Sequence, residues 1–368
     1  MKAEVNINAL RAAVKNVQRA VAKTALPVLD NLLVEAGRDE EKGFLRLSAT
    51  DLGTTISQVV EAAIPKTGST TVPAVTFGEL LASLDGESVA LSLGKGEVLT
   101  VKADESRSRI KGIPAAEYPS LPNVNGTESV TVSADTLARA VKLVAFAAAK
   151  KEDRSPLHGV QFHAENGKLR LTAVDGYRLS IVTLPVDGGG NFAIAIPAKA
   201  AVNLQRIISG CGDAPVSVAA EQERIAFECL GKRLVSQAIE GKYPDVLSLI
   251  PESRNTRITL DLLPLETAVK QASLFGDAAR FDAEGESVAV SGKSQEAGET
   301  KTALKGIVEG EKAAFALNSA FVKDVLKEAK GADAAEVFLD VVASDKPVVL
   351  RFRGLDEYQH VIMPMRLD

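Results

Sequence analysis

Two carboxylates, Asp51 and Asp175, end the matching segments LRLSATD and LRLTAVD, which lie 124 residues apart. A pair of aspartates can serve as general acid and general base in a hydrolysis. Both, however, follow a strand-like alternation and precede a turn, where an aspartate side chain commonly accepts hydrogen bonds from backbone amides. We therefore expect a structural role at the turns. A hydrolase is the alternative, and it predicts that Asp→Asn abolishes an activity while the fold survives.

Histidine and cysteine, the other residues that often carry chemistry, show no arrangement typical of a site. His158 and His163 are five residues apart on one expected strand, so their side chains would point to opposite faces, and His360 is distant from both in the sequence. Cys211 and Cys229 are expected to be free, buried thiols. Because no cysteine or carboxylate lies at metal-ligand spacing, we expect no metal and no cofactor.

The motifs of common enzyme classes are missing. The sequence contains no GxxxxGK[ST], GxGxxG, GxSxG or HExxH. The glycines of DGGGN (187–191) lie between polar residues and expected strands, so we interpret this segment as a hairpin tip. The chain is therefore expected not to be an enzyme.

The composition indicates a globular protein of more than one domain. The 368 residues exceed one ordinary core, and 46% hydrophobic with 25% charged residues is typical of folded proteins. No apolar run is long enough to span a bilayer and the start has no signal-peptide pattern, so we expect a cytoplasmic protein without a membrane partner. The net charge of −5 and the absence of tryptophan, taken alone, disfavour nucleic acid as a partner.

Three internal repeats organise the chain. The tripeptide AVK recurs at 13–15, 140–142 and 268–270, each time where an alternating stretch leads into a helical pattern. Each repeat is expected to hold two helices on mostly antiparallel sheets, so the predicted fold class is α+β. The turn-rich stretches NVNGTES and PESRNTR place the expected domains at 1–126, 127–254 and 255–368.

Basic residues concentrate on the expected helices. These helices carry a net charge of +9 and the rest of the chain −14, with the helices expected at 9–23, 76–86, 136–151, 197–209, 265–275 and 318–330. The first and third would contain no acidic residue, whereas a solvated helix face normally mixes both signs. This asymmetry predicts a surface that contacts phosphates of a polyanion without reading sequence, through Arg11, Lys15, Arg19, Lys23, Arg139, Lys142, Lys150, Lys199 and Arg206.

The chain resembles the bacterial beta sliding clamp family, the processivity subunits of DNA polymerase III, along its whole length. The motifs ALPVLDNLLVEA, LSATDL, LHGVQF, AVDGYRLSI, IEGKYPDV and VIMPMRL carry the resemblance in family order and spacing. It implies the DNA clamp fold, in which two three-domain subunits join head to tail into a ring-shaped homodimer that encircles duplex DNA and tethers the replicative polymerase. The resemblance also implies association with the nucleoid.

The resemblance further implies a pocket for short linear motifs between the second and third domains. Its partners would be the DNA polymerase III alpha subunit, the clamp loader, other polymerases, and mismatch-repair and ligase proteins. The implied walls are Leu157, Val174, Gly176, Tyr177, Arg178, Leu179, Pro244, Leu249, Val361, Met363, Pro364, Met365, Arg366 and Leu367. Val174 and Tyr177 replace residues more usual in the family, and Asp368 adds a carboxylate beside the pocket. Unbranched methionines repack around different ligands, which suits a shared site.

Two more sets of residues are implied by the resemblance. Lys23, Lys151 and Arg154 would contact DNA. At the subunit seam, Arg107, Arg109 and Ile110 of SRSRIKG would face Leu274, Phe275, Glu296 and Glu299 of a second copy. An open, monomeric scaffold that uses the same pocket without encircling DNA is the alternative within the binding class.

Overall fold

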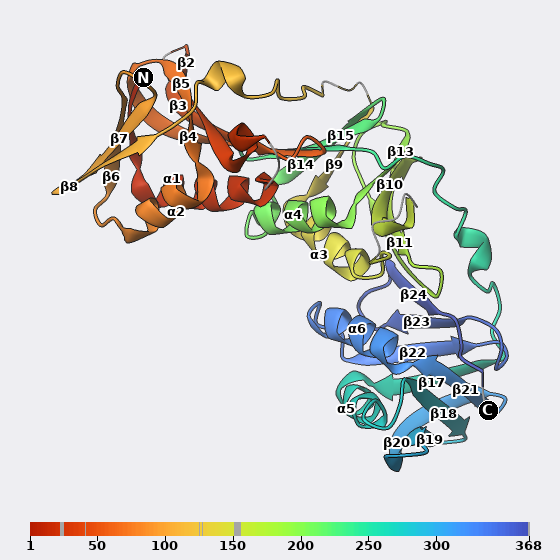
Figure 1. The fold of residues 1–368 in the computed structure, drawn as a ribbon. Coiled ribbons are helices and arrows are strands. Elements are labelled where there is room, and N and C mark those ends of the chain that lie inside the picture. The colour runs from red at the N-terminus through yellow and green to blue at the C-terminus, as the bar shows by residue number, and fades with distance from the viewer. Residues whose placement is uncertain (23–25, 41, 125, 127, 151–155, 367–368) are drawn as a thin grey trace. The chain divides into compact units, whose positions relative to one another are not determined.

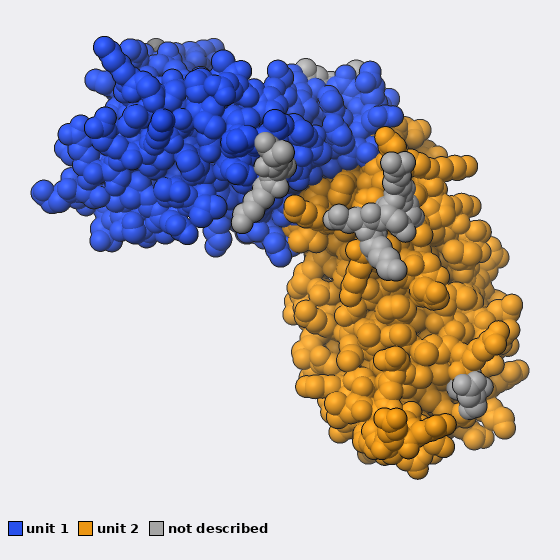
Figure 2. All heavy atoms as spheres, viewed as in Figure 1, with its two compact units in different colours: residues 1–136, 187–190, 203–238 blue, residues 137–186, 191–202, 239–368 orange. Residues whose placement is uncertain are grey.

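The protein is described by a computed structural model over residues 1–22, 26–40, 42–124, 126, 128–150 and 156–366. The chain divides into two compact units, coloured separately in Figure 2. Unit 1 comprises residues 1–136, 187–190 and 203–238, and unit 2 comprises residues 137–186, 191–202 and 239–368.

Every α-helix among the described residues directly follows a β-strand, and the same order recurs three times (Figure 1). The helices are α1 (Ile7–Val17), α2 (Ala74–Ser83), α3 (Ala134–Ala145), α4 (Ala198–Ile208), α5 (Leu262–Ala272) and α6 (Ser319–Lys330). The strands just before them are β1 (Lys2–Asn6), β5 (Gly68–Pro73), β9 (Glu128–Ser133), β13 (Phe192–Pro197), β17 (Thr256–Asp261) and β21 (Ala313–Asn318). The threefold recurrence confirms the repeat read from the sequence.

The remaining strands complete eight per repeat in the described residues. They are β2 (Asn31–Asp39), β3 (Lys42–Thr50), β4 (Thr54–Lys66), β6 (Ser88–Leu93), β7 (Val98–Ala103), β8 (Ser106–Lys111), β10 (Gly159–Glu165), β11 (Lys168–Val174), β12 (Arg178–Pro185), β14 (Pro215–Glu221), β15 (Arg224–Cys229), β16 (Lys232–Gln237), β18 (Ala278–Glu284), β19 (Ser287–Ser294), β20 (Gly298–Gly310), β22 (Glu336–Val341), β23 (Val348–Phe352) and β24 (Tyr358–Ile362). Short 3₁₀ turns include Gln18–Ala20, Pro27–Asp30, Ala115–Glu117, Pro156–His158 and Leu247–Leu249.

One antiparallel sheet runs through each unit. In unit 1 the strand order is β8-β7-β6-β1-β4-β16-β15-β14-β9, with β3, β2 and β5 branching from β4. In unit 2 the order is β13-β10-β11-β12-β24-β23-β22-β17-β20-β19-β18-β21. Adjacent repeats therefore share a sheet within each unit, and the alternating burial along the strands puts one face of each sheet toward the helices.

The joint between repeats has the same hydrogen-bonding pattern in both units. In unit 1, β4 pairs antiparallel with β16, and the backbone amide of Gln237 donates to the carbonyl of Gly53 at 2.8 Å. In unit 2, β12 pairs antiparallel with β24, and the amide of Met363 donates to the carbonyl of Tyr177 at 2.8 Å. The fourth strand of one repeat thus pairs with the eighth and last strand of the next repeat.

Local sequence explains where the first helix begins and ends. Asn6 caps α1, because its side-chain oxygen accepts from the amides of Asn8 and Ala9 at 3.0 Å. Leu10 and Val14 share the buried face against β3 and β4. After Val17 the chain tightens into a 3₁₀ turn, so the helix is shorter than the 9–23 expected from periodicity.

Shorter helices weaken the predicted separation of charge. The six α-helices carry ten basic and five acidic residues, a smaller excess than expected. Asp135 lies in the first turn of α3, so the expectation that this helix contains no acid is wrong. Lys150 follows α3 instead of belonging to it.

Two other local expectations are also wrong. The DGGGN segment is no hairpin tip, because β12 pairs with β11 and β24, whereas β13 pairs with β10. Asp187 instead forms a β-bridge with Thr131. His158 ends a 3₁₀ turn and His163 lies on β10, so the two histidines do not share a strand.

Candidate functional site

The turn between β11 and β12 is held by Asp175. Its Oδ1 accepts from the backbone amides of Tyr177 and Arg178, each at 3.0 Å. Gly176 occupies the turn at φ +91°, a conformation that favours glycine. The result presents the side chain of Tyr177 to solvent, with 67% of its surface exposed. Asp51 binds the amides of Gly53 and Thr54 in the same way, so the predicted structural role of both aspartates is confirmed.

Arg178 points away from the predicted pocket. Only 3% of the residue is exposed. Its Nε donates to Asp175 Oδ2 at 3.0 Å, its Nη1 to Asp324 Oδ2 at 2.7 Å and its Nη2 to the carbonyl of Phe146 at 2.9 Å. The guanidinium also lies over the rings of Phe146 and Phe321, with 4.5 Å to the second centroid. The placement of Arg178 in the pocket wall is therefore corrected, because successive strand residues face opposite sides.

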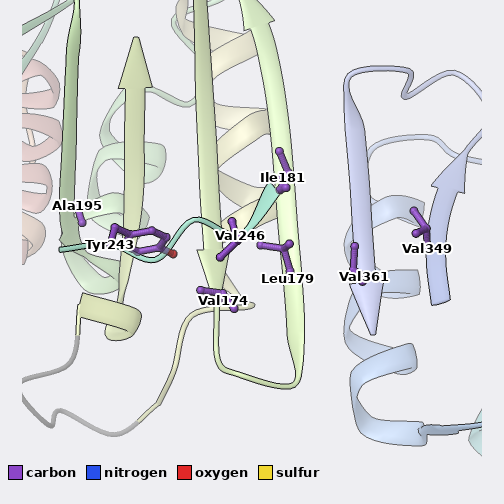
Figure 3. Packing of buried hydrophobic residues seen from close by; sticks show 8 residues of the cluster. All are labelled: Val174, Leu179, Ile181, Ala195, Tyr243, Val246, Val349 and Val361. Carbon is purple, nitrogen blue, oxygen red and sulfur yellow. The ribbon is translucent and has the colours of Figure 1, made fainter. Parts of the chain in front are cut away.

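The opposite face of β12 contributes to an apolar cluster (Figure 3), which we call the joint cluster. It brings together residues from β11, β12, β13, β23, β24 and the segment before residue 250: Val174, Leu179, Ile181, Ala195, Tyr243, Val246, Val349 and Val361. Leu157 and Ile250 pack against it while remaining partly exposed. The hydroxyl of Tyr243 donates to the carbonyl of Thr172 at 3.2 Å, and burial raises the pKa of that phenol.

Four residues in or against the joint cluster were among the expected pocket walls, and the others were not. Val174, Leu179, Val361 and the neighbouring Leu157 were expected. Ile181, Ala195, Tyr243, Val246, Val349 and Ile250 were not. Alternation along β12 could have indicated Ile181, because it shares a face with Leu179. No local pattern indicates Val349, since β23 reaches the cluster only through its pairing with β24.

Exposed apolar residues lie within two positions of cluster residues, or of Ile250, in the sequence. Tyr177, Leu247, Leu249 and Met363 expose between 41% and 67% of their surface. Pro244 and Arg366 are exposed, and Pro364 and Met365 are half-buried. The end of the described chain is anchored, since the amide of Met365 donates to the carbonyl of Ala316 at 2.8 Å. Leu367 and Asp368 lie outside the described residues.

The equivalent joint in unit 1 lacks this apolar surface. Thr55 and Ser57 on β4 stand where β12 has Leu179 and Ile181. Hydroxyl-bearing side chains offer less apolar area for a ligand than leucine and isoleucine do. The two joints share backbone geometry, and only the one in unit 2 has the composition of an apolar binding surface.

The side chain of Arg11 forms hydrogen bonds within its own unit. Its Nε donates to the carbonyl of Leu81 at 2.6 Å, and its Nη2 donates to the carbonyl of Leu84. Its Nη1 donates to Asn8 Oδ1 at 3.1 Å. The guanidinium therefore satisfies carbonyls at the end of α2, and the expectation that Arg11 faces a phosphate is wrong.

Arg19 and Arg206 lie close together in unit 1. Burial lowers the pKa of Arg19, and the neighbouring charge of Arg206 lowers it further. The Nε of Arg19 is buried and has no hydrogen-bond partner among the described residues. The backbone of Arg19 is fixed by Asn203, whose side-chain amide donates to its carbonyl at 3.3 Å. Two adjacent cations make a local site of positive potential.

The other basic candidates differ in how far they are paired. Lys15, Lys150, Lys199 and Arg206 are exposed. Arg139 forms an ion pair with Glu357 at 3.1 Å and Lys142 approaches Glu328 at 3.9 Å, although both cations keep nearly half of their side-chain surface exposed. Lys23, Lys151 and Arg154 lie outside the described residues.

The predicted seam residues are exposed with one exception. Leu274 exposes 73% of its surface, Phe275 is half-buried, and Arg107, Arg109, Glu296 and Glu299 are exposed. Ile110 exposes only 7% and packs inside its own unit, so its side chain is not available to a second copy as expected. β8 pairs only with β7 among the described strands, which leaves one edge of β8 open.

Buried polar chemistry also occurs at the joint in unit 2. His360 is fully buried, and its Nδ1 lies 2.6 Å from Ser180 Oγ. Its Nε2 has no hydrogen-bond partner among the described residues. Burial and the charge of Arg178 lower the pKa of His360 to about 3, so the ring is neutral at physiological pH. Because Ser180 and His360 are both fully buried, a substrate cannot contact them.

Neither cysteine forms a disulfide. Cys229 is buried as expected, whereas Cys211 is only half-buried. Among the described residues, no group of three or more histidine, cysteine or carboxylate side chains is arranged to hold a metal ion. No helix in the described part of the chain is both long and apolar enough to cross a membrane.

Solved structures with the same fold are polymerase sliding clamps. The DNA polymerase III beta subunit from Thermotoga maritima superposes with a TM-score of 0.91 at 25% identity, covering all of both chains. The DNA polymerase sliding clamp from Bacillus subtilis gives a TM-score of 0.91 at 23% identity over the same coverage, which supports the fold. The fold is thus that of a sliding clamp.

The sequence comparisons identify the family. Family models match the N-terminal domain of the DNA polymerase III beta subunit at residues 1–122, its central domain at 131–245 and its C-terminal domain at 247–366. Similar proteins include the beta sliding clamps of Synechocystis sp., 27% identical over 95% of each chain, and of Chlamydia muridarum, 27% identical over 100% of this chain and 99% of the relative. The chain belongs to the DNA polymerase III beta subunit family, and its three-domain α+β fold is confirmed.

Proposed function

We propose that this protein is a DNA sliding clamp that closes as a head-to-tail homodimer around duplex DNA and tethers the replicative polymerase. The observation that carries the proposal is the repeated joint, which leaves one matching half-joint open at each end of the repeat series. Closure by a second copy would satisfy both open halves. The clamp would act by encirclement and binding, without catalysis.

The two internal joints define what a third joint requires. Each joins the beginning of the fourth strand of one repeat to the eighth strand of the following repeat, as β4 to β16 and β12 to β24. The fourth strand of the third repeat is β20, which contains 13 residues as β4 does. The first repeat has the corresponding final strand, β8, which contains six residues as β16 does. In this chain β20 pairs only with β17 and β19 among the described strands.

Transferring the register gives specific contacts between two copies. Thr54, the first residue of β4, pairs with Ser236, and by position this corresponds to Gly298 opposite Ile110. One step further along, Glu299 would lie opposite Arg109 of the other copy. Opposite charges directly across an antiparallel pair are favourable. Arg107 would lie opposite Lys301, so Arg109 carries the favourable ion pair in this register.

Contact with DNA would be weak and independent of sequence. Exposed cations on the helices, such as Lys15, and the adjacent pair Arg19 and Arg206 suit phosphate oxygens. A phosphate between two guanidiniums would relieve their repulsion. Each neutralised phosphate is expected to contribute about −0.9 to the salt slope of binding. A small number of such contacts permits sliding once the ring is closed.

The joint cluster and its exposed border would receive the linear motifs of partners. The cluster provides a buried apolar floor, and Tyr177, Leu249 and Met363 provide movable walls. Expected partners are the DNA polymerase III alpha subunit, the clamp loader, other polymerases, and mismatch-repair and ligase proteins. Competition for one pocket would make their binding mutually exclusive.

The pocket is tested by measuring the affinity of a fluorescent peptide that carries the clamp-binding segment of the cognate polymerase alpha subunit. Met363→Ala and Tyr177→Ala are expected to weaken binding at least tenfold, because truncating a side chain that dominates a binding pocket costs about 2 kcal/mol or more. Leu52→Ala is the matched control, since Leu52 is exposed at the equivalent turn of unit 1. The assignment would be contradicted if all three variants weakened binding equally, or if neither Met363→Ala nor Tyr177→Ala weakened it.

The organisation of the chain follows from the same proposal. Domains at 1–126, 127–254 and 255–368 would each supply one repeat of the ring. Their limits are supported by the turn-rich segments and by the order of eight strands and two helices in each repeat. A protein with this role would work in the cytoplasm, on the DNA of the nucleoid.

A further inference from the structure

The hairpin of β15 and β16 brings a cysteine and a lysine onto one face of the unit 1 sheet. Cys229 ends β15, Lys232 begins β16, and the two are direct partners in the antiparallel ladder. Leu230 and Gly231 form the connecting turn at φ 49° and 72°. Side chains directly opposite each other in such a ladder lie on the same face, with Cβ atoms roughly 5 Å apart.

The second cysteine reaches the same place from the end of α4. Lys232 Nζ donates to Cys211 Sγ at 3.1 Å and to the carbonyl of Ile207 at 2.8 Å. Cys211 lies close enough to Cys229 to add to the effect of burial in raising the pKa of the Cys229 thiol. The only two cysteines of the chain are therefore neighbours, with an ammonium group held against one of them.

The surroundings give the two sulfurs different chemistry. Cys211 is half-buried, so a small reagent can reach it, and the Lys232 ammonium lies 3.1 Å from its sulfur. Cys229 is only 2% exposed. Burial and the adjacent Cys211 raise the pKa of Cys229 to about 11, so this residue stays a protonated thiol. One sulfur is accessible and contacts a cation, and the other is buried beside it.

The backbone around Cys211 allows the sulfur to change its geometry. Gly210 and Gly212 flank it at φ 79° and 60°, and a Cβ added at either glycine would meet no atom within 4 Å. Disulfide formation requires the sulfurs to close to roughly 2 Å in a defined dihedral. A glycine on each side, with open space around both, makes that adjustment possible without moving the sheet.

We propose that Cys211 and Cys229 form a peroxide-reactive dithiol, with Cys211 as the attacking thiolate and Cys229 as the resolving thiol. The Cys211 thiolate attacks one oxygen of hydrogen peroxide, breaking the O–O bond to give a sulfenic acid at Cys211 and hydroxide, which becomes water with the proton lost from Cys211. The Cys229 sulfur then attacks the Cys211 sulfur, and the departing hydroxyl leaves as water with the Cys229 proton. In total, two thiols are oxidised to one disulfide while one peroxide is reduced to two waters.

The disulfide would tie the end of α4 to the end of β15. Cys211 lies three residues after Ile208, the last residue of α4, and that helix also carries Arg206. In a reducing cytoplasm the bond would form only during oxidative exposure and would later be reduced by cellular thiols, as is usual for redox-sensing cysteines. Lys232 would lose Cys211 Sγ as a hydrogen-bond partner while keeping the carbonyl of Ile207.

Peptide mass spectrometry tests the proposal on the folded, full-length protein. Trypsin cuts after Arg206, Arg224 and Lys232, so Cys211 and Cys229 fall in separate peptides that only a disulfide would join. Brief treatment with hydrogen peroxide is expected to give the joined peptide in the wild type. In Cys229→Ser, dimedone should label a sulfenic acid at Cys211, whereas Cys211→Ser should show no label at Cys229.

Lys232 provides the decisive control. Lys232→Met should slow oxidation by about tenfold, the effect expected when an anion loses one charge-assisted hydrogen bond. Lys232→Arg should retain most of the rate because it restores a cationic donor. Failure to form the joined peptide unless urea is present, or equal rates in Lys232→Met and wild type with circular dichroism unchanged, would overturn the proposal.

Discussion

Arg178 Nη1 lies 2.7 Å from Asp324 Oδ2. This contact joins β12, which begins at Arg178 directly after the turn held by Asp175, to helix α6 of the third repeat. The same guanidinium binds Asp175, the residue that shapes the turn. Arg178 therefore braces the turn that carries the exposed Tyr177. One side chain thus links the packing between repeats to the geometry of this turn.

Replacing Arg178 should destabilise unit 2. Arg178→Met would leave Asp175 without its buried cationic partner, and loss of one member of a buried pair costs about 3–5 kcal/mol. Asp324→Asn should cost less, about 1 kcal/mol or below, because that side chain is 45% exposed. Urea unfolding followed by circular dichroism measures both changes, and hydrogen exchange should show faster exchange in β12. Equal effects of the two variants would contradict this account.

His360 should make the protein sensitive to mild acid. The unfolded chain binds a proton at His360 near pH 6.5, whereas the folded chain keeps this ring neutral until about pH 3. Stability contributed by the neutral ring is thus complete above pH 6.5 and falls by about 1.4 kcal/mol for each pH unit below it.

The variant His360→Gln isolates this contribution. Its unfolding free energy, measured by urea titration at several pH values between 6.5 and 4.5, should fall less steeply with acid than that of the wild type. His163→Gln is the control, because His163 is partly exposed and burial lowers its pKa by less than that of His360. An unchanged slope in His360→Gln would show that the ring is protonated in the folded state.

Lys15 and Arg11 lie on one helix but should behave differently toward DNA. Lys15→Ala should reduce the magnitude of the salt slope for duplex binding by about 0.9, the value for one phosphate contact. Arg11→Ala should leave that slope unchanged and lower stability by about 1–3 kcal/mol, because the carbonyls of Leu81 and Leu84 lose their donor. Fluorescence anisotropy of a labelled duplex across salt concentrations distinguishes them. A reduced slope for Arg11→Ala would contradict the structural role.

Leu274 should be required for dimer formation. It exposes 73% of its surface just beyond α5, and Leu274→Asp would place a charge in an apolar contact between copies. Leu263→Asp is the matched control, as Leu263 is 57% exposed at the start of the same helix. Native mass spectrometry should find twice 38.7 kDa for the wild type and the control, and 38.7 kDa for Leu274→Asp. A monomeric wild type would favour the open scaffold.

The repeat made much of the fold predictable. Three copies of one pattern indicated the six helices and the antiparallel sheets, and the turn role of Asp51 followed from its position after a strand. The helix ends were less predictable, because periodicity continues through the 3₁₀ turn after Val17 where the backbone hydrogen bonding changes. The error in helix length then exaggerated the charge carried by the helices.

Membership of the joint cluster was predictable where it depends on local sequence, and it was missed where it depends on pairing between distant strands. Successive residues of a strand face opposite sides, so Arg178 and Leu179 cannot both face the same surface. This rule alone would have excluded Arg178 from the pocket wall that the resemblance implied. Val349 enters the joint cluster through strand pairing that no local pattern specifies. The contacts of Arg11 depend on how α1 meets the end of α2, which the sequence of either helix does not determine.

Retention on DNA of different topology tests the central claim most directly. The protein would be loaded onto nicked circular DNA with its cognate clamp loader, washed at high salt to remove electrostatic binding, and then exposed to a nuclease that cuts the circle once. A closed ring predicts retention on the intact circle at high salt and release after the cut. Release from intact circles by salt alone would mean that the protein binds DNA only electrostatically, and would contradict the clamp.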